Sequence, residues 1–213
     1  ADIELRGSLA DAAASGDATA RDTLAAWRKA WRLPAGSAFT DSAWRDAKTA
    51  ALARLRADGY ASAAWTATSA DVDVDRASAH TRVAADSGPL FRTGALVIEG
   101  LVRQDDVTVR NLADFDPGTP ATEALLREYQ ERLQRTGLFE RAAVTSSADP
   151  AEAAAAPVTV RLSELALQQT TVGVGVSAKD GPRMSLEHVH RQIFGAPATL
   201  RNKVEIADLR SAW

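Results

Sequence analysis

Apolar residues recur at helical spacing in one stretch of the first half of the chain. The stretch lies between Thr40 and Gly59, and its apolar positions are Trp44, Ala47, Ala51 and Leu55. Threonine is a good helix N-cap, and glycine readily adopts the left-handed conformation that ends a helix. The pattern therefore predicts a helix over residues 41–58 with one buried face.

The second half contains a similar stretch between Thr122 and Gly137. Its predicted inward-facing residues are Leu125, Leu126, Tyr129 and Leu133. The opposite surface, residues 127–135, alternates arginine, glutamate and glutamine, which indicates a solvated face with the ion pairs Glu128–Arg132 and Glu131–Arg135. A second helix is therefore expected over residues 123–136.

Both helices lie within the same order of elements. The predicted strands are residues 3–7, 61–69 and 77–85 in the first half, and 96–100, 140–147 and 158–163 in the second. Shorter helices are expected over residues 20–31 and 105–113, and a loop over residues 148–156. The order strand, helix, helix, strand, strand therefore occurs twice. This repeat predicts two α+β domains, residues 1–92 and 93–166, each with two helices on a three-stranded sheet.

The pattern changes in the remaining segment, residues 167–213. Valine alternates with small or hydroxylated residues over 171–177, and two more extended stretches are expected over 184–191 and 199–206. Strands of ~9–11 residues with one apolar face are typical of outer-membrane barrels. Three strands cannot close a barrel, so the segment predicts the truncated start of a larger membrane protein.

Composition argues against an enzyme. The chain has no cysteine and only three histidines, which excludes disulfides and thiolate chemistry and leaves little for acid–base catalysis. A net charge of −3 with 25% charged residues argues against a nucleic-acid-binding surface. No catalytic, cofactor or nucleotide-binding motif is present, so the expected protein is a non-enzymatic module without cofactors.

Two short motifs resemble metal sites without completing one. The acidic run Asp71-Val-Asp73-Val-Asp75 has an arginine, Arg76, where a calcium loop needs glycine. His188 and His190 would share one face of a strand, but no third ligand lies near them in the sequence. No metal site is therefore predicted.

A βααββ sheet leaves one strand of its final hairpin at an edge, where unpaired N–H and C=O groups can bind an extended peptide. The alternative interpretation is an ordinary half-buried strand. The candidate partner-strand edge consists of Arg141, Ala142, Ala143, Val144, Thr145, Ser146 and Ser147.

The first predicted barrel strand is also a candidate for pairing with a strand of another protein. Gly173 and Gly175 weaken strand packing and let another backbone approach closely, or they only accommodate barrel curvature. The candidate residues of this strand are Thr171, Val172, Gly173, Val174, Gly175, Val176 and Ser177.

Several stretches resemble a known family. They are residues 129–144, 156–161 (Ala-Pro-Val-Thr-Val-Arg), 171–177 and 181–191, together with Phe194-Gly195. They are similar to the outer-membrane subunit of the translocation and assembly module, the TamA family of the Omp85/BamA superfamily. The resemblance is most specific from about residue 94 to residue 206.

The resemblance implies that the two halves are POTRA (polypeptide-transport-associated) domains in the periplasm of a Gram-negative bacterium. The segment from about Thr171 would begin a sixteen-stranded outer-membrane barrel, with Thr171–Ser177 at its lateral gate. The implied function is insertion of autotransporters and other unfolded or nascent β-barrel proteins, with a TamB-type inner-membrane-anchored partner. The core barrel-assembly factor and two-partner secretion transporters of the same superfamily are the alternatives.

Overall fold

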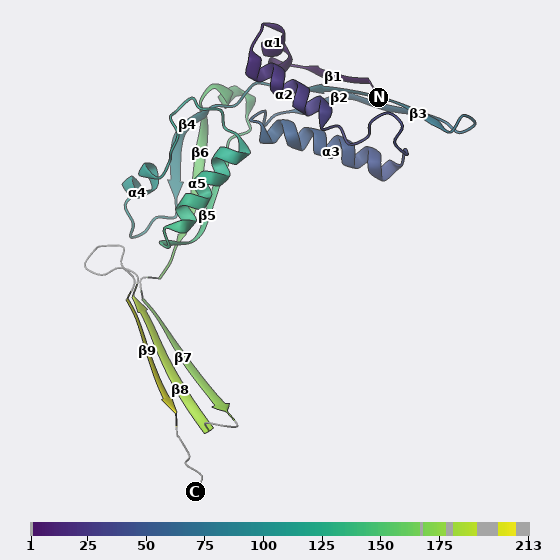
Figure 1. Ribbon diagram of the computed structural model, residues 1–213. Helices are drawn as coiled ribbons and strands as arrows, with labels where there is room; N and C mark the ends of the chain where they lie inside the picture. Colours follow the sequence, from purple (N-terminus) through teal and green to yellow (C-terminus); the bar gives the residue numbers. More distant parts are fainter. Residues whose placement is uncertain (1, 167, 178–180, 191–199, 208–213) are drawn as a thin grey trace.

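The computed structural model describes residues 2–166, 168–177, 181–190 and 200–207. Their strands form three separate three-stranded sheets, which follow one another along the chain (Figure 1). Helices pack on the first two sheets, whereas the third is drawn without any helix (Figure 1). No helix in the described part of the chain is both long and apolar enough to cross a membrane.

The first sheet has the strand order β1-β3-β2. Its strands are β1 (Asp2–Arg6), β2 (Ala64–Asp73) and β3 (Ser78–Asp86). The pair β1–β3 is parallel and the hairpin β2–β3 is antiparallel. The helices are α1 (Ser8–Ala14), α2 (Ala18–Lys29) and α3 (Asp41–Ala57).

The helix α3 forms for the reasons that its sequence indicates. Thr40 accepts a hydrogen bond from the N–H of Ala43 at 3.1 Å, and the four predicted apolar residues of α3 are buried. Trp31 packs edge-on against Trp44 and Trp65, with ring centroids 6.1 and 6.3 Å apart. These aromatic contacts join the segment after α2, which contains Trp31, to α3 and to the sheet.

Two predictions for this domain need correction. The helix α1 was not expected, because it has only seven residues and its N-cap, Gly7, makes no side-chain hydrogen bond. The strand predicted from residue 61 begins at Ala64 and runs on to Asp73, because its pairing with β3 continues as far as Ser78.

The second sheet repeats the topology in the order β4-β6-β5. Its elements are β4 (Thr93–Glu99), α4 (Asp106–Asn111), α5 (Glu123–Arg135), β5 (Phe139–Ser146), a 3₁₀ helix η1 (Pro150–Ala155) and β6 (Ala156–Glu164). β4 pairs with β6 in parallel and β5 pairs with β6 antiparallel. The expected loop over residues 148–156 is thus largely helical, because Asp149 caps the N–H of Ala151 at 2.9 Å.

The third sheet is an antiparallel meander in the order β7-β8-β9. Its strands are β7 (Gln168–Ser177), β8 (Gly181–His190) and β9 (Leu200–Ala207). It is an open sheet, and a closed barrel is not evident among the described residues. The predicted strand ends at 191 and 199 lie outside the described residues.

Candidate partner-strand interface

The edge position of β5 follows from the strand order β4-β6-β5. Residues Arg141–Ser146 of the predicted edge lie within β5. Ser147 follows the strand, and its N–H donates to the carbonyl oxygen of Pro157 at 3.1 Å, on the side of β6. Ser147 therefore offers no N–H group to a partner at the free edge.

Only alternate residues of β5 turn their backbone groups toward the free edge. The N–H of Ser147 faces β6, and the direction of the backbone groups alternates along an antiparallel strand. Arg141, Ala143 and Thr145 therefore bond to β6. Ala142, Val144 and Ser146 face outward, so an added strand would pair with these three residues.

The helix α5 contributes two residues that the sequence did not single out. Gln130 Oε1 accepts a hydrogen bond from the N–H of Val144 at 3.2 Å. Gln134 Nε2 donates to the carbonyl oxygen of Ala142 at 3.4 Å. Part of the predicted solvated face of this helix therefore contacts the edge strand.

The rest of that helix face carries ion pairs, with one difference from the prediction. Glu131 pairs with Arg135 at 3.8 Å, as predicted. Arg132 pairs instead with Asp114 at 3.9 Å, and its Nε donates to the carbonyl oxygen of Leu112 at 3.0 Å. The predicted Glu128–Arg132 pair is therefore wrong, because Arg132 reaches the segment after α4.

A hollow of about 490 Å³ lies at the end of the β5 edge. It is lined by the end of α3, by α5 and by β5: Arg56, Ala57, Ala61, Ala121, Glu123, Leu126, Arg127, Gln130, Val144, Thr145 and Ser146. The hydroxyl oxygen of Ser146 is buried and has no hydrogen-bond partner among the described residues. A buried hydroxyl group in this wall can therefore accept a further hydrogen bond.

The first two domains meet at Phe91, beside this hollow. The side chain of Phe91 is 1% exposed and packs in a cluster with Ala121, Ala153 and Ala156. The N–H of Ala121 donates to the carbonyl oxygen of Phe91 at 2.9 Å. The linker therefore contributes to the core of the junction and fixes one wall of the hollow.

The end of β6 is anchored by Glu164, whose side chain is 4% exposed. Its carboxylate accepts hydrogen bonds from the N–H groups of Val102, Arg103 and Gln104 at 2.9–3.2 Å. Burial of the carboxyl group alone would raise its pKa. The three N–H groups and the Arg103 guanidinium outweigh burial and hold the pKa of Glu164 below its ordinary value.

The predicted gate residues Thr171–Ser177 lie in β7, which forms one edge of the third sheet. A Cβ atom at Gly173 would lie 2.6 Å from the hydroxyl oxygen of Ser185 on β8, whereas Gly175 has only ordinary contacts with Arg183. Gly173 therefore permits the close approach to Ser185, while Gly175 is not required by packing within this sheet.

The two faces of the third sheet differ in chemistry. Apolar residues of the three strands form cross-strand rows on one face: Val172, Leu186 and Val204, then Val174, Met184 and Ile206. All six are exposed, up to 81% at Val174. The other face carries the ion pairs Arg201–Glu187 at 3.3 Å and Arg183–Glu205 at 4.0 Å. The sheet is therefore amphipathic, and no described element packs on its apolar rows.

Residues of the two metal-like motifs make other contacts. His188 Nδ1 lies 3.0 Å from the hydroxyl oxygen of Thr170, and the rings of His188 and His190 are 6.5 Å apart. Asp73 accepts a hydrogen bond from the N–H of Arg76 in the hairpin turn. No group of three or more potential metal ligands occurs within the described ranges.

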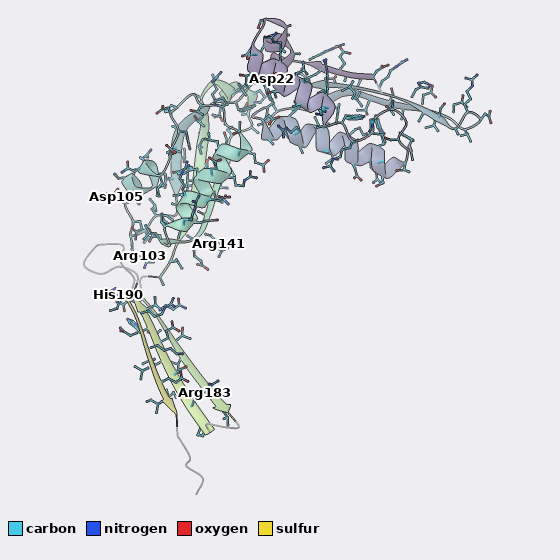
Figure 2. All side chains as sticks on the ribbon, viewed as in Figure 1. Asp22, Arg103, Asp105, Arg141, Arg183 and His190 are labelled. Atoms are coloured by element: carbon cyan, nitrogen blue, oxygen red, sulfur yellow. The ribbon has the colours of Figure 1, made fainter. Side chains whose placement is uncertain are left out.

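Figure 2 shows where the labelled residues lie on the three parts of the chain. Arg141 lies on the second domain, whereas Arg183 and His190 lie toward opposite ends of the third sheet (Figure 2). The edge of β5 and the third sheet are therefore separate surfaces, joined through Glu164 and the segment that follows it.

No protein-family model matches this chain, and no curated protein matches it. One similar solved structure is BamA from Haemophilus ducreyi lacking POTRA domains 1–3. It has a TM-score of 0.64 and 14% sequence identity, covering 97% of this chain and 37% of that chain. Another is POTRA3–5 of BamA from Haemophilus influenzae, with a TM-score of 0.53 and 23% identity, covering 76% of this chain and 60% of that chain.

This chain therefore spans less than two thirds of the length of either structure. At these identities the likeness concerns the fold. The mixed α+β domains with three-stranded sheets share the fold of the POTRA domains in these BamA structures.

Proposed function

We propose that this chain is the POTRA region, with the first barrel strands, of an outer-membrane protein that assembles or translocates other outer-membrane proteins. The two α+β domains lie in the periplasm, and β7–β9 begin the barrel. The free edge of β5, with the outward-facing backbone of Ala142, Val144 and Ser146, is the observation that carries the proposal.

The substrate binds in this proposal by adding a strand to β5. Pairing through main-chain groups tolerates many substrate sequences, which suits a factor that handles several unfolded β-barrel proteins. The exposed side chains of Ala143 and Thr145 are small and obstruct an approaching strand little. The function requires neither catalysis nor a cofactor.

The third sheet has a second role in the same proposal. Its apolar rows face lipid, and its charged face lines the interior of the barrel, which is the arrangement that outer-membrane barrels use. β7 lies at the seam of the barrel as a lateral gate. Its free edge and its glycines at 173 and 175 support this assignment, since glycine weakens strand packing.

Photo-crosslinking in the full-length protein tests both edges. A photoreactive amino acid at Thr145 or Thr171 should capture unfolded β-barrel precursors. The same group at Arg161, an exposed residue of the central strand β6, should capture little, because both edges of β6 are already paired. Failure at both Thr145 and Thr171, or equal capture at Arg161, would contradict the mechanism.

The finer assignment is to the TamA type, which works with a TamB-type inner-membrane partner and inserts autotransporters. The stretches 129–144 and 181–191 support it through their resemblance to that family. The likeness to two BamA structures favours the core barrel-assembly factor as a second candidate. For the first assignment, the full-length protein purified from native membranes should bring a TamB-type partner with it. Purification without such a partner would favour the second assignment.

A further inference from the structure

Two glutamine side chains of α5 bond to the backbone of the free edge of β5. Gln130 and Gln134 are four residues apart and therefore lie on the same face of the helix. The groups that they contact, the N–H of Val144 and the carbonyl oxygen of Ala142, both face outward from the sheet. The helix thus supplies one acceptor and one donor to the open side of the strand.

A glutamine side chain carries the same carbonyl acceptor and N–H donor as a peptide group. An added strand would place a carbonyl oxygen at the Val144 N–H and an N–H at the Ala142 carbonyl oxygen. The two side chains therefore occupy hydrogen-bonding positions that a partner strand needs. A strand can pair fully with β5 only after both glutamines have moved away.

This arrangement is specific to the second domain. The strand β2 occupies the corresponding edge of the first sheet, in the order β1-β3-β2. In the first domain the corresponding helix contact lies one residue before the edge strand, where the Arg56 guanidinium of α3 donates to the carbonyl oxygen of Ala63 at 3.0 and 3.3 Å. Among the described residues, contacts from one helix to two outward-facing groups within the edge strand are therefore a feature of the second domain.

A second observation points to an occupant at the same edge. Ser146 is the next outward-facing residue after Val144, and its buried hydroxyl oxygen has no hydrogen-bond partner in the described part of the chain. Ser146 also lines the hollow of about 490 Å³ together with Gln130. An incoming segment that pairs with Val144 would continue into this hollow and reach the hydroxyl group.

We infer that Gln130 and Gln134 are intramolecular substitutes for a partner strand, which bond to the free edge of β5 and are displaced when an extended segment of another protein pairs with it. The inference rests on the proposed augmentation of β5 and adds the two residues whose hydrogen bonds must break before a strand can bind. Displacement costs two hydrogen bonds, so the pair weakens binding of every strand by a similar factor.

A titration with a labelled peptide tests this. The probe is a synthetic peptide with the sequence of residues 168–177, an extended segment of this chain, and fluorescence anisotropy measures its affinity for the full chain. Each net hydrogen bond changes affinity by roughly fivefold, so the variant Gln130→Ala with Gln134→Ala should bind the probe about 25-fold more tightly. Glu128→Ala, an exposed change on the same helix, should leave affinity unchanged.

The site of binding is checked by photo-crosslinking the probe from Thr145. Equal affinity of the wild-type chain and the double variant, with crosslinking at Thr145, would overturn the role of the glutamines and leave augmentation of β5 intact. Absence of binding by every form would overturn the proposed augmentation and this inference together.

Hydrogen exchange gives a readout that needs no partner. The Val144 amide should exchange several times faster in Gln130→Ala than in the wild-type chain, while Gln130→Glu, which keeps an acceptor oxygen, should preserve slow exchange. Exchange at the N–H of Thr145, which faces β6, serves as the internal control. Unchanged exchange at Val144 in Gln130→Ala would also overturn the inference.

Discussion

The N–H of Phe91 donates a hydrogen bond to the carbonyl oxygen of Gly59, 2.9 Å away. Gly59 follows the end of α3 and has a positive φ of 97°. The linker between the first two domains is therefore tied to the end of the longest helix of the first domain. The next residue, Arg92, exchanges backbone hydrogen bonds with Ala153 and Ala156 at 2.8 Å, so the linker is held from both sides.

Replacing Phe91 by alanine should weaken this junction strongly. The fully buried ring leaves a cavity between the domains, and such changes cost about 3–5 kcal/mol. Urea unfolding of the full chain should show this loss, or should separate into two transitions as the domains uncouple. Val97→Ala, at a partly exposed position of β4, should change the free energy of unfolding by about 0.5 kcal/mol or less. A similarly small effect for Phe91→Ala would show that the linker does not join the domains.

Tyr129 gives a second prediction, in the core of the second domain. Its hydroxyl group donates to the carbonyl oxygen of Val109 at 2.8 Å. Tyr129→Phe removes this hydrogen bond and leaves the Val109 carbonyl oxygen with only the 3.3 Å bond from the N–H of Leu112, so the change should cost about 0.5–1.5 kcal/mol at neutral pH. Circular dichroism melts of the two proteins measure the difference.

The pH dependence of this pair provides a sharper check. Burial raises the pKa of Tyr129 to about 12, although Arg110 and Arg132 act in the opposite direction. The contribution of Tyr129 to the free energy of unfolding is therefore fully present at pH values below the ordinary tyrosine pKa, and it is lost as the pH rises toward about 12. The difference in unfolding free energy between wild type and Tyr129→Phe should shrink between neutral pH and pH values above about 10. A difference independent of pH would contradict the burial argument.

Glu164 should show the opposite dependence on pH. Its pKa is lower in the folded state than the ordinary value, so its contribution is present above the ordinary pKa and is lost as the pH falls through the folded pKa. Glu164→Gln removes the charge that three N–H groups stabilise and should cost about 1–3 kcal/mol at pH 7. Unfolding measured from pH 7 down to pH 3 should converge for the two proteins. Glu140→Gln, an exposed change on β5, controls for the loss of one negative charge.

Helix ends and buried faces could be predicted because they depend on neighbouring residues. Thr40 and Thr122 cap their helices through N–H groups three residues ahead. The repeated strand order also predicted an edge for the final hairpin of each sheet. Neighbouring residues do not indicate that the outward-facing backbone groups of β5 receive hydrogen bonds from side chains. Those bonds depend on α5, which packs beside the strand.

Gln130 illustrates this limit. In the sequence it belongs to a polar helix face, and polar residues at such positions are usually solvated. Its contact with Val144 arises because the turn at Gly137, with a positive φ of 69°, sends the chain back along α5 as β5. The edge strand could therefore be located from the pattern of strands, but its two polar contacts with α5 required the three-dimensional arrangement.

The apolar rows of the third sheet lead to the last prediction. Val174 and Ile206 flank Met184 in one row and are 81% and 68% exposed. Large apolar side chains that are exposed in adjacent strands form a surface that binds detergent or another apolar surface. The double change Val174→Asn and Ile206→Asn should therefore remove most of the binding of the chain to detergent micelles, measured by the shift in elution volume on gel filtration.

The control is the double change Thr171→Asn and Lys203→Gln, on the charged face of the same strands, which should leave micelle binding unchanged. Equal binding by both double variants would place the apolar contact elsewhere and would argue against a lipid-facing role for this sheet.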